Sequence, residues 1–204
     1  HGRWDSQWAV GTPTPPLWPE LAGRTLGILG YGRIGREVAR RARAFDMEVR
    51  AVRRDPMQSA GDEFAAVSGP DGLDDLLAFA DYLVLTLALT DDTRGLVSAR
   101  ELGLMKPTAM LINVARGPVV DQAALYHALK DKAIAAAAID VWYHYPTNAD
   151  PTMPADQPFH ELPNVLMTPH ASGWTEGMLR ARTDVVVENI TRIESGMPLL
   201  NNIP

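Results

Sequence analysis

The sequence predicts an α/β fold built on a doubly wound parallel sheet. Short apolar runs alternate with segments of helical periodicity along most of the 204 residues, a pattern typical of a parallel sheet covered by helices on both faces. The first apolar run leads into GYGRIG at residues 30–35. Because a G-x-G-x-x-G motif between a strand and a helix is the dinucleotide-binding fingerprint, we expect a Rossmann-type sheet.

Each glycine of this motif has a physical role. Gly30 allows the tight turn, Gly32 lets a pyrophosphate approach the backbone, and Gly35 lets helix and strand pack closely. The helix that follows offers free backbone N–H groups and the positive end of its dipole to the phosphates. The alternative interpretation is an ordinary glycine-rich turn of an α/β protein, which the strand–turn–helix context disfavours.

Composition and charge restrict the class of protein. The chain is 46% hydrophobic, enough for a sizeable core, and it has no apolar run long enough to span a bilayer. A formal net charge of −6 argues against nucleic acid or an anionic membrane as the main partner. The absence of cysteine excludes disulfides and thiolate sites and is compatible with a cytoplasmic protein. No metal site is predicted.

The predicted elements alternate along the chain. Strands are predicted at residues 25–30, 47–52, 82–87, 108–114, 133–139 and 165–168. Helices are predicted at residues 33–45, 73–80, from 99, at 122–129 after the cap Asp121, and at 174–195, with a short extra helix capped by Thr90 or Asp91. In the first helix, the buried stripe is predicted to be Ile34, Val38, Ala42 and Phe45.

Three segments are predicted to lack long regular elements. Residues 1–20 are expected to form a short helix and a proline-rich linker, whose tryptophans form a binding patch or cover an apolar face. Residues 56–72 are predicted as loop and weak helix. Residues 141–164 are predicted as a long proline-rich loop.

The end of the second predicted strand bears on which dinucleotide binds. In NAD-binding units an acidic side chain here bonds the ribose 2′-hydroxyl, whereas an arginine accommodates a 2′-phosphate. Here the strand ends in Arg53, Arg54 and Asp55. Two guanidinium groups suit a phosphate dianion, so the sequence favours NADP(H) over NAD(H). The alternative is that Arg53 is solvated and Asp55 turns towards the ribose.

Three polar side chains follow the last predicted strands, namely Arg116, Asp140 and His170. Ligands of such sheets bind at the carboxyl ends of the strands. Each residue alone has an ordinary explanation as an exposed arginine, a capping aspartate or a loop histidine. Their joint placement on one edge favours a catalytic site.

Five segments carry a resemblance to a known family. In chain order they read GYGRIG, LTDDTRGLV, LMKPTAMLINVARGPVVDQAAL, AAIDVW and ELPNVLMTPHASGWT. The chain resembles the nucleotide-binding domain of the D-isomer-specific 2-hydroxyacid dehydrogenases, which include phosphoglycerate dehydrogenase, glyoxylate/hydroxypyruvate reductases and formate dehydrogenase. The resemblance implies an oxidoreductase of CH–OH donors that transfers a hydride between NAD(P)H and C2 of a small 2-keto or 2-hydroxy acid.

The resemblance also implies roles for individual residues. Arg116 would grip the substrate carboxylate and polarise the carbonyl, which suits a forked guanidinium. His170 would be the acid/base that exchanges a proton with the substrate oxygen. Asp140 would hold the nicotinamide carboxamide. Arg116 and His170 would also contact the cofactor. Further cofactor contacts are implied for Arg33, Ile34, Leu87, Thr93, Val114, Ala115, Ser172 and Gly173.

Position 145 departs from the family pattern. Family members usually carry a glutamate there, and formate dehydrogenases a glutamine, as the partner of the histidine, whereas this chain has Tyr145. A carboxylate favours imidazolium, but a neutral phenol orients the ring without adding charge. We therefore expect keto-acid reduction to be optimal at lower pH than in glutamate-bearing relatives. Tyr145 is the third catalytic candidate, with His144 as the alternative partner, and formate dehydrogenase itself is disfavoured.

Length is the second departure from the family pattern. Family members begin with a substrate-binding half-domain of about a hundred residues, for which this sequence leaves no room. Residues 1–175 are expected to form the NAD(P)-binding domain, and residues 176–204 a crossover helix and tail towards the missing lobe. Such a chain would bind dinucleotide, turn over poorly and form a homodimer through this domain. The alternative function is a non-catalytic nicotinamide-nucleotide sensor or interaction protein.

Overall fold

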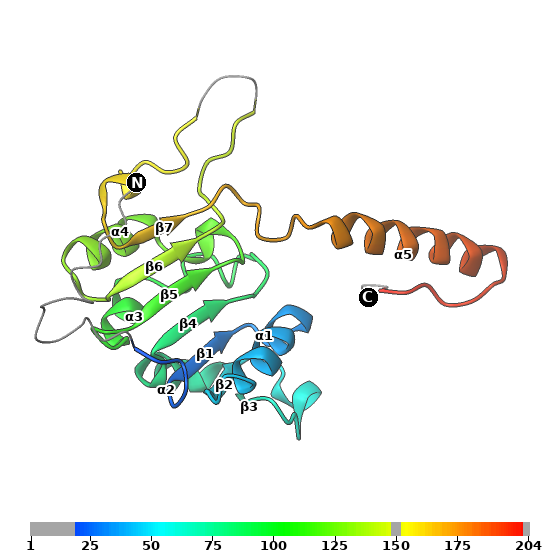
Figure 1. The fold of residues 1–204 in the computed structure, drawn as a ribbon, viewed down its shortest axis with the longest axis horizontal. Coiled ribbons are helices and arrows are strands. Elements are labelled where there is room, and N and C mark those ends of the chain that lie inside the picture. The colour runs from blue at the N-terminus through cyan, green and yellow to red at the C-terminus, as the bar shows by residue number, and fades with distance from the viewer. Residues whose placement is uncertain (1–18, 148–151, 202–204) are drawn as a thin grey trace, which may run out of the picture.

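The computed structural model describes residues 19–147 and 152–201 and contains a seven-stranded, entirely parallel sheet (Figure 1). Its strands are β1 (Thr25–Leu29), β2 (Glu48–Val52), β3 (Ala66–Ser68), β4 (Tyr82–Leu85), β5 (Met110–Asn113), β6 (Ala136–Ile139) and β7 (Val165–Met167). The strand order is β3-β2-β1-β4-β5-β6-β7. The order reverses direction between β1 and β4, which confirms the predicted doubly wound α/β fold.

Within the described residues, five α-helices connect and flank the strands. They are α1 (Arg33–Arg43), α2 (Leu73–Phe79), α3 (Ala99–Leu104), α4 (Gln122–Lys130) and α5 (Glu176–Glu194). Asp121 caps α4 as predicted, because its carboxylate accepts the backbone N–H of Ala124 at 2.8 Å. Ser98 and Glu101 form a capping box at the start of α3, and the Thr175 hydroxyl caps α5.

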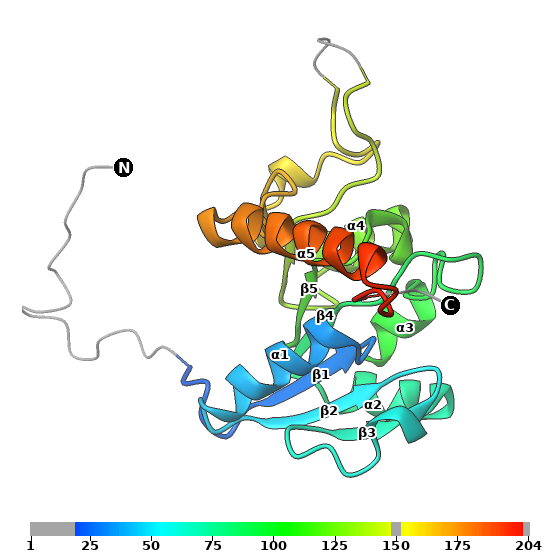
Figure 2. The same cartoon turned by 90° about the vertical axis from the view of Figure 1, so that its right-hand side faces the viewer.

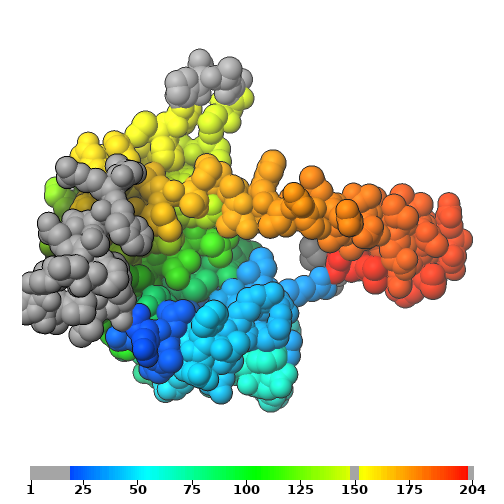
Figure 3. All heavy atoms as spheres, in the orientation of Figure 1, coloured from blue at the N-terminus to red at the C-terminus, as the bar shows by residue number. Residues whose placement is uncertain are grey.

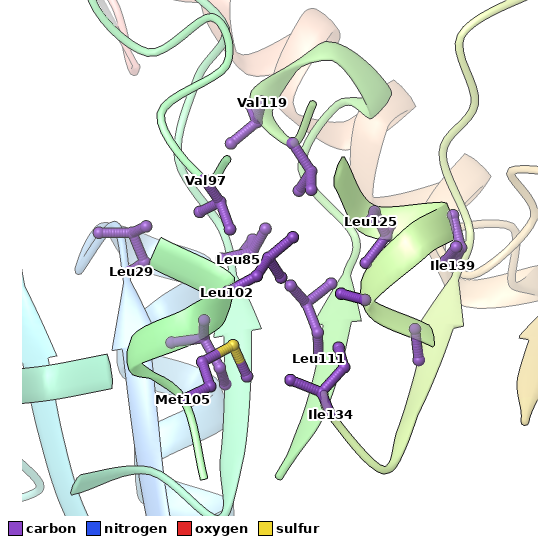
Figure 4. Packing of buried hydrophobic residues seen from close by; sticks show 14 of the residues in the cluster. Leu29, Leu85, Val97, Leu102, Met105, Leu111, Val119, Leu125, Ile134 and Ile139 are labelled. Atoms are coloured by element: carbon purple, nitrogen blue, oxygen red, sulfur yellow. The ribbon is translucent and has the colours of Figure 1, made fainter. Parts of the chain in front are cut away.

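The larger core lies between the sheet and the helices α2, α3 and α4 (Figure 4). Leu83, Leu85 and Leu111 of the central strands are fully buried there. Their burial on the helix side, together with Val84 on the other side, explains why the central strands read as nearly continuous apolar runs.

The smaller core lies between α1 and the strands β1 and β2. The prediction for the buried stripe of α1 was partly wrong, since Ile34 and Phe45 are 62% and 58% exposed. Ala42 is buried as predicted and Val38 packs against this core while partly exposed, and the other buried residues of the helix are Gly35 and Ala39. Small residues on this face let the helix axis approach the sheet closely, which leaves the larger side chains outside.

Two predictions about local structure were wrong. Residues 66–68 form β3 rather than loop, because they pair with β2 at the edge of the sheet; three residues are too few to show the alternation of a strand. No helix follows Thr90, where residues 91–95 form turns instead. The Thr93 hydroxyl closes this segment through hydrogen bonds with the carbonyl of Ala88 and the N–H of Thr90. The helix predicted near the N-terminus lies outside the described residues.

Helix α5 extends away from the sheet as an arm, on the same side as α1 (Figures 1, 2 and 3). No residue of α5 is buried. Its exposed apolar side chains are Leu179, Val186, Val187, Ile190 and Ile193. The tail after α5 folds back along the helix, where the Asn189 side chain hydrogen-bonds the backbone of Leu200 in both directions. The next residue, Asn201, accepts a hydrogen bond from Arg33 at the start of α1.

Within the described part of the chain, helices cover one face of the sheet and only part of the other. The expectation of a sheet covered on both faces is therefore met in part. Helices α2, α3 and α4 cover the first face, whereas α1 covers the opposite face at β1 and β2 (Figure 1). Leu166 of β7 is accordingly 65% exposed. None of the described helices is long and apolar enough to cross a bilayer.

Candidate cofactor and catalytic site

The glycine motif forms the turn from β1 to α1 at the carboxyl edge of the sheet. Gly30 has φ +98°, and a Cβ there would lie 2.6 Å from the backbone nitrogen of Leu87. A Cβ on Gly35 would lie 2.6 Å from the carbonyl oxygen of Gly30. The structure thus requires glycine at both positions, for the turn and for the close contact of helix and strand that the sequence predicted.

Gly32 differs from the other two glycines because a Cβ there would meet no atom within 4 Å. It is the N-cap of α1, which has no side-chain cap and no acidic residue in its first turn. The backbone N–H groups of Arg33 and Ile34 open the helix and have no intrahelical acceptor. This open helix N-terminus, with space that a side chain at position 32 would fill, fits the pyrophosphate of a dinucleotide.

Arg53 follows β2 and contacts the first turn of the loop after it. Its two terminal nitrogens donate to Ser59 Oγ at 2.6 Å and to Gln58 Oε1 at 2.5 Å. The Asp55 carboxylate accepts from Gln58 Nε2 at 2.9 Å and caps this turn, so in this structure it does not face the glycine motif. Arg54 is exposed. Gln58 and Ser59 are therefore candidate site residues that the sequence did not indicate.

A hydrogen-bonded cluster holds the end of this loop against α1. The buried Tyr31 hydroxyl donates to Asp62 at 2.7 Å, and Arg36 Nε lies 2.7 Å from the other oxygen of the same carboxylate. Burial alone would raise the pKa of Asp62, but the hydrogen bonds from Tyr31, Phe64 and Arg36 outweigh it and lower the pKa. The central tyrosine of GYGRIG thus fixes the loop that follows Arg53.

A buried amide shapes the turn that carries Arg116. Asn113, at the end of β5, is 1% exposed. Its Oδ1 accepts the N–H of Ala115 at 3.0 Å, and its Nδ2 donates to the carbonyl of Arg116 at 3.1 Å. A Cβ on Gly117 would lie 2.4 Å from the carbonyl oxygen of Trp142, so this turn packs directly on the loop after β6. Sequence reasoning missed Asn113, although it is the one polar residue of MLIN.

Asp140 follows β6 and binds the loop that carries His170. It is 4% exposed, and its carboxylate accepts hydrogen bonds from the hydroxyls of Thr168 and Ser172 and from the backbone N–H groups of Ala171 and Ser172. Burial would raise the pKa of Asp140, but these four bonds outweigh it and lower the pKa to about 2. The carboxylate is fully engaged here, so a nicotinamide carboxamide would have to displace a donor such as the Ser172 hydroxyl to reach it.

His170 follows β7 in a left-handed backbone conformation, with φ +58°. Non-glycine residues seldom adopt this region, and it concentrates at functional sites. The Tyr145 hydroxyl lies 3.0 Å from His170 Nδ1 and accepts the backbone N–H of Trp142 at 3.0 Å. His144 instead pairs with Asp156 at 2.9 Å. Of the two partners considered from the sequence, the structure therefore pairs Tyr145 with His170.

The three polar residues lie on one edge because their strands are neighbours. Arg116, Asp140 and His170 follow β5, β6 and β7, which are adjacent and parallel. Arg116 and His170 are exposed. The glycine motif follows β1, which is separated from β5 by β4 alone. It therefore lies at the same carboxyl edge of the sheet as these three residues. No group of three histidine or acidic residues that could hold a metal ion occurs among residues 19–147 and 152–201.

The remaining candidates line this edge in different ways. Leu87 packs against the turn at Gly30, and Val114 and Ala115 pack into the two cores. Thr93 is engaged within its own turn. The backbone above Gly173 is open, since a Cβ there would meet nothing within 4 Å.

A doubly wound sheet with an open glycine turn at its switch point is a nucleotide-binding Rossmann domain. The chain belongs to the D-isomer-specific 2-hydroxyacid dehydrogenase family, since the family model described as "D-isomer specific 2-hydroxyacid dehydrogenase, NAD binding domain" matches residues 2–172. This confirms the resemblance seen in the sequence.

Curated proteins with similar sequences support the same family. The chain is 37% identical over 195 residues to a glyoxylate reductase of Thermococcus gammatolerans, covering 96% of this chain and 56% of that protein. It is 36% identical over 197 residues to a D-3-phosphoglycerate dehydrogenase of Methanocaldococcus jannaschii, covering 96% and 34%. The chain therefore spans about half the length, or less, of these curated relatives.

Solved structures show the same likeness. An NADPH-dependent glyoxylate/hydroxypyruvate reductase from Sinorhizobium meliloti, in complex with NADP and sulfate, matches with a TM-score of 0.79 and 30% identity, covering 92% of this chain and 58% of that one. A D-isomer specific 2-hydroxyacid dehydrogenase from Xanthobacter autotrophicus Py2, in complex with NADPH and MES, matches with a TM-score of 0.80 and 34% identity, covering 100% and 76%.

Proposed function

We propose that this chain is the cofactor-binding part of an oxidoreductase that interconverts small 2-keto and 2-hydroxy acids. One observation carries the proposal: Arg116, Asp140 and His170 follow three adjacent strands on the edge that also holds the open glycine turn. Relatives named glyoxylate reductase support this substrate class. The bound nicotinamide supplies or accepts the hydride at C2 of the acid.

The chain's own residues then bind, orient and exchange a proton. The N–H groups of Arg33 and Ile34 bind the pyrophosphate. The Arg116 guanidinium binds the substrate carboxylate through two parallel hydrogen bonds. His170 gives a proton to the carbonyl oxygen in reduction and takes it from the hydroxyl in oxidation. Asp140 keeps the His170 loop in place through its four hydrogen bonds.

Replacing His170 by glutamine tests this function in the intact protein with glyoxylate and NADPH. Because an amide cannot transfer the proton, kcat is expected to fall about 10²- to 10⁴-fold, while NADPH affinity stays within about twofold of the parent, a difference of only about 0.4 kcal/mol. His127→Gln makes the same change on the exposed side of α4 and should leave both quantities unaltered. Unchanged kcat in His170→Gln would refute the assigned role.

NADP(H) is the cofactor that we propose the site prefers. Arg53 already forms a hydrogen-bonded group with Gln58 and Ser59, and Arg54 is exposed beside it. Both guanidinium groups can bind a 2′-phosphate, with the Ser59 hydroxyl as a further donor. The engagement of both Asp55 oxygens with the next turn supports this preference, since these contacts hold the carboxylate to residues 57 and 58.

Arg53→Asp is expected to reverse the preference. Loss of charge-assisted hydrogen bonds should weaken NADPH binding about 10- to 100-fold, while NADH binds equally well or better, as measured by calorimetric titration. Arg50→Asp makes the same charge change within β2, where Arg50 pairs with Glu48, and should not alter the ratio of the two affinities. A parent chain that binds NADH more tightly than NADPH would contradict the proposal.

We also propose that residues 176–204 run towards a substrate-binding lobe and that the protein is a cytoplasmic homodimer. Helix α5 has no buried residue and exposes apolar side chains such as Val186 and Ile190, which supports a packing partner for this helix. The partial coverage of the curated relatives supports a further lobe in the intact protein.

A further inference from the structure

The Tyr145 hydroxyl lies between two nitrogen atoms with different roles. The backbone N–H of Trp142 can only donate, and it points at the hydroxyl oxygen over 3.0 Å. His170 Nδ1 lies at 3.0 Å from the same oxygen. Since the oxygen already accepts from Trp142, the single hydroxyl proton is left for Nδ1. No other hydrogen bond to this hydroxyl occurs within the described residues.

This arrangement favours one of the two positions that the proton of a neutral His170 can take. A neutral imidazole has one N–H donor and one bare acceptor nitrogen. If Nδ1 accepts from Tyr145, Nε2 must carry the hydrogen. A carboxylate at position 145 could only accept, so it would place the hydrogen on Nδ1 and leave Nε2 bare. The tyrosine therefore reverses the direction of the hydrogen bond.

Hydrogen bonds around the site position the loop of Tyr145 and the loop of His170 relative to each other. Trp142 donates its backbone N–H to Tyr145 and its indole Nε1–H to the carbonyl of Thr168 at 2.8 Å. One residue thus ties the loop of Tyr145 to the loop of His170. Asp140 fixes the other side of His170 through the N–H groups of Ala171 and Ser172.

We propose that Tyr145 holds neutral His170 as its Nε2–H tautomer, so that the unprotonated site still donates a hydrogen bond to the carbonyl oxygen of a 2-keto acid. The binding half of this inference rests on the proposed function, whereas the tautomer itself does not. A hydroxy acid gains less, because its hydroxyl proton meets an N–H rather than a bare nitrogen. Tyr145 thereby acts as a positioning residue that selects the keto acid.

The protonated state fits the same geometry. Imidazolium donates from both nitrogens, and the Tyr145 oxygen can accept from Nδ1 with its second lone pair while its own proton turns to solvent, to which the residue is 45% exposed. The titratable or charged groups on the surrounding elements are Asp140 after β6, Arg116 after β5, and the His144–Asp156 pair of the long loop.

Long-range ¹H–¹⁵N correlation spectra of the ¹⁵N-histidine-labelled 204-residue chain test the tautomer directly. At a pH where the imidazole is neutral, His170, assigned by the loss of its signals in His170→Gln, should show Nδ1 in the unprotonated range and Nε2 in the protonated range. Tyr145→Glu should invert this pattern, and Tyr145→Phe should give a mixture of both tautomers.

Tyr143→Phe is the matched control. The Tyr143 hydroxyl lies in the same loop but donates to the carbonyl of Val120 at 3.0 Å, so its removal should leave the His170 pattern unchanged. A parent spectrum with the hydrogen on Nδ1, or an unaltered spectrum in Tyr145→Phe, would overturn the tautomer assignment.

Binding of oxamate, an unreactive isostere of the 2-keto acid pyruvate, tests the consequence in the intact protein. Through the alkaline range the parent should keep its affinity, whereas Tyr145→Glu should lose about fivefold to tenfold as its imidazole becomes neutral. Equal loss in both proteins would overturn the selection of the keto acid. If oxamate does not bind the parent at any pH, the proposed function fails, while the spectra still decide the tautomer.

Discussion

Replacing Gly30 by alanine is expected to destabilise the chain by about 4 kcal/mol, enough to unfold much of it. The new Cβ would lie 2.6–2.7 Å from three atoms of Leu87, in a backbone with φ +98°. Overpacking costs about 1–3 kcal/mol and a left-handed alanine about as much again. Urea unfolding followed by circular dichroism measures the loss.

Gly103→Ala is the control for this substitution. Gly103 lies inside α3, and a Cβ there would meet nothing within 4 Å. The same added methyl should therefore stabilise the chain by about 0.5–1 kcal/mol, since alanine favours a helix. A Gly30→Ala chain as stable as its parent would show that the described turn at Gly30 is wrong.

Asp140→Asn is expected to cost about 2–4 kcal/mol although the two side chains have the same shape. Hydroxyls can rotate to accept from the new amide, but a backbone N–H group cannot. Because Ala171 and Ser172 donate to different oxygens of Asp140, one of these two N–H groups would face the NH2 of the asparagine. The loop would then lose the support that keeps His170 at φ +58°. Asp121→Asn at the cap of α4 is the control, where either residue caps equally well.

The acid dependence of unfolding provides a second readout for Asp140. Because its pKa is lowered from 3.8 to about 2 in the folded chain, ionisation stabilises the fold above about pH 4, and this contribution is lost as the pH falls towards 2. It amounts to about 2 kcal/mol. The stability difference between the parent and Asp140→Asn should therefore shrink over this interval. A constant difference would contradict the role given to these hydrogen bonds.

The sequence predicted the sheet and the edge at which Arg116, Asp140 and His170 follow adjacent strands because both depend on local patterns. Apolar runs locate the central strands, and a polar residue directly after a strand locates the edge, as with Asp140 and His170. The glycine motif even predicted which contacts Gly30 and Gly35 make, since the turn itself imposes them.

What the sequence could not predict depends on contacts between distant segments. Nothing local shows that Tyr31 will reach Asp62, or that Arg53 will lie beside Ser59. The left-handed His170 lies in a loop whose neighbouring residues donate hydrogen bonds to Asp140, thirty residues earlier in sequence. Whether Tyr145 or His144 is the partner of His170 likewise depends on the path of a loop without regular structure, which the sequence does not show. The prediction of the buried residues of α1 was partly wrong because periodicity does not show how closely a helix approaches its sheet.

Calorimetric titration of NADPH into the 204-residue chain and its Gly32→Ala variant tests the central claim most directly. A Cβ at Gly32 touches no protein atom but occupies the space at the start of α1, so the variant should fold with unchanged stability. The parent is expected to bind NADPH, and the variant is expected to bind it at least tenfold more weakly. A variant that binds as tightly as its parent, or a folded parent that binds no dinucleotide, would contradict the assignment of this edge as the cofactor site.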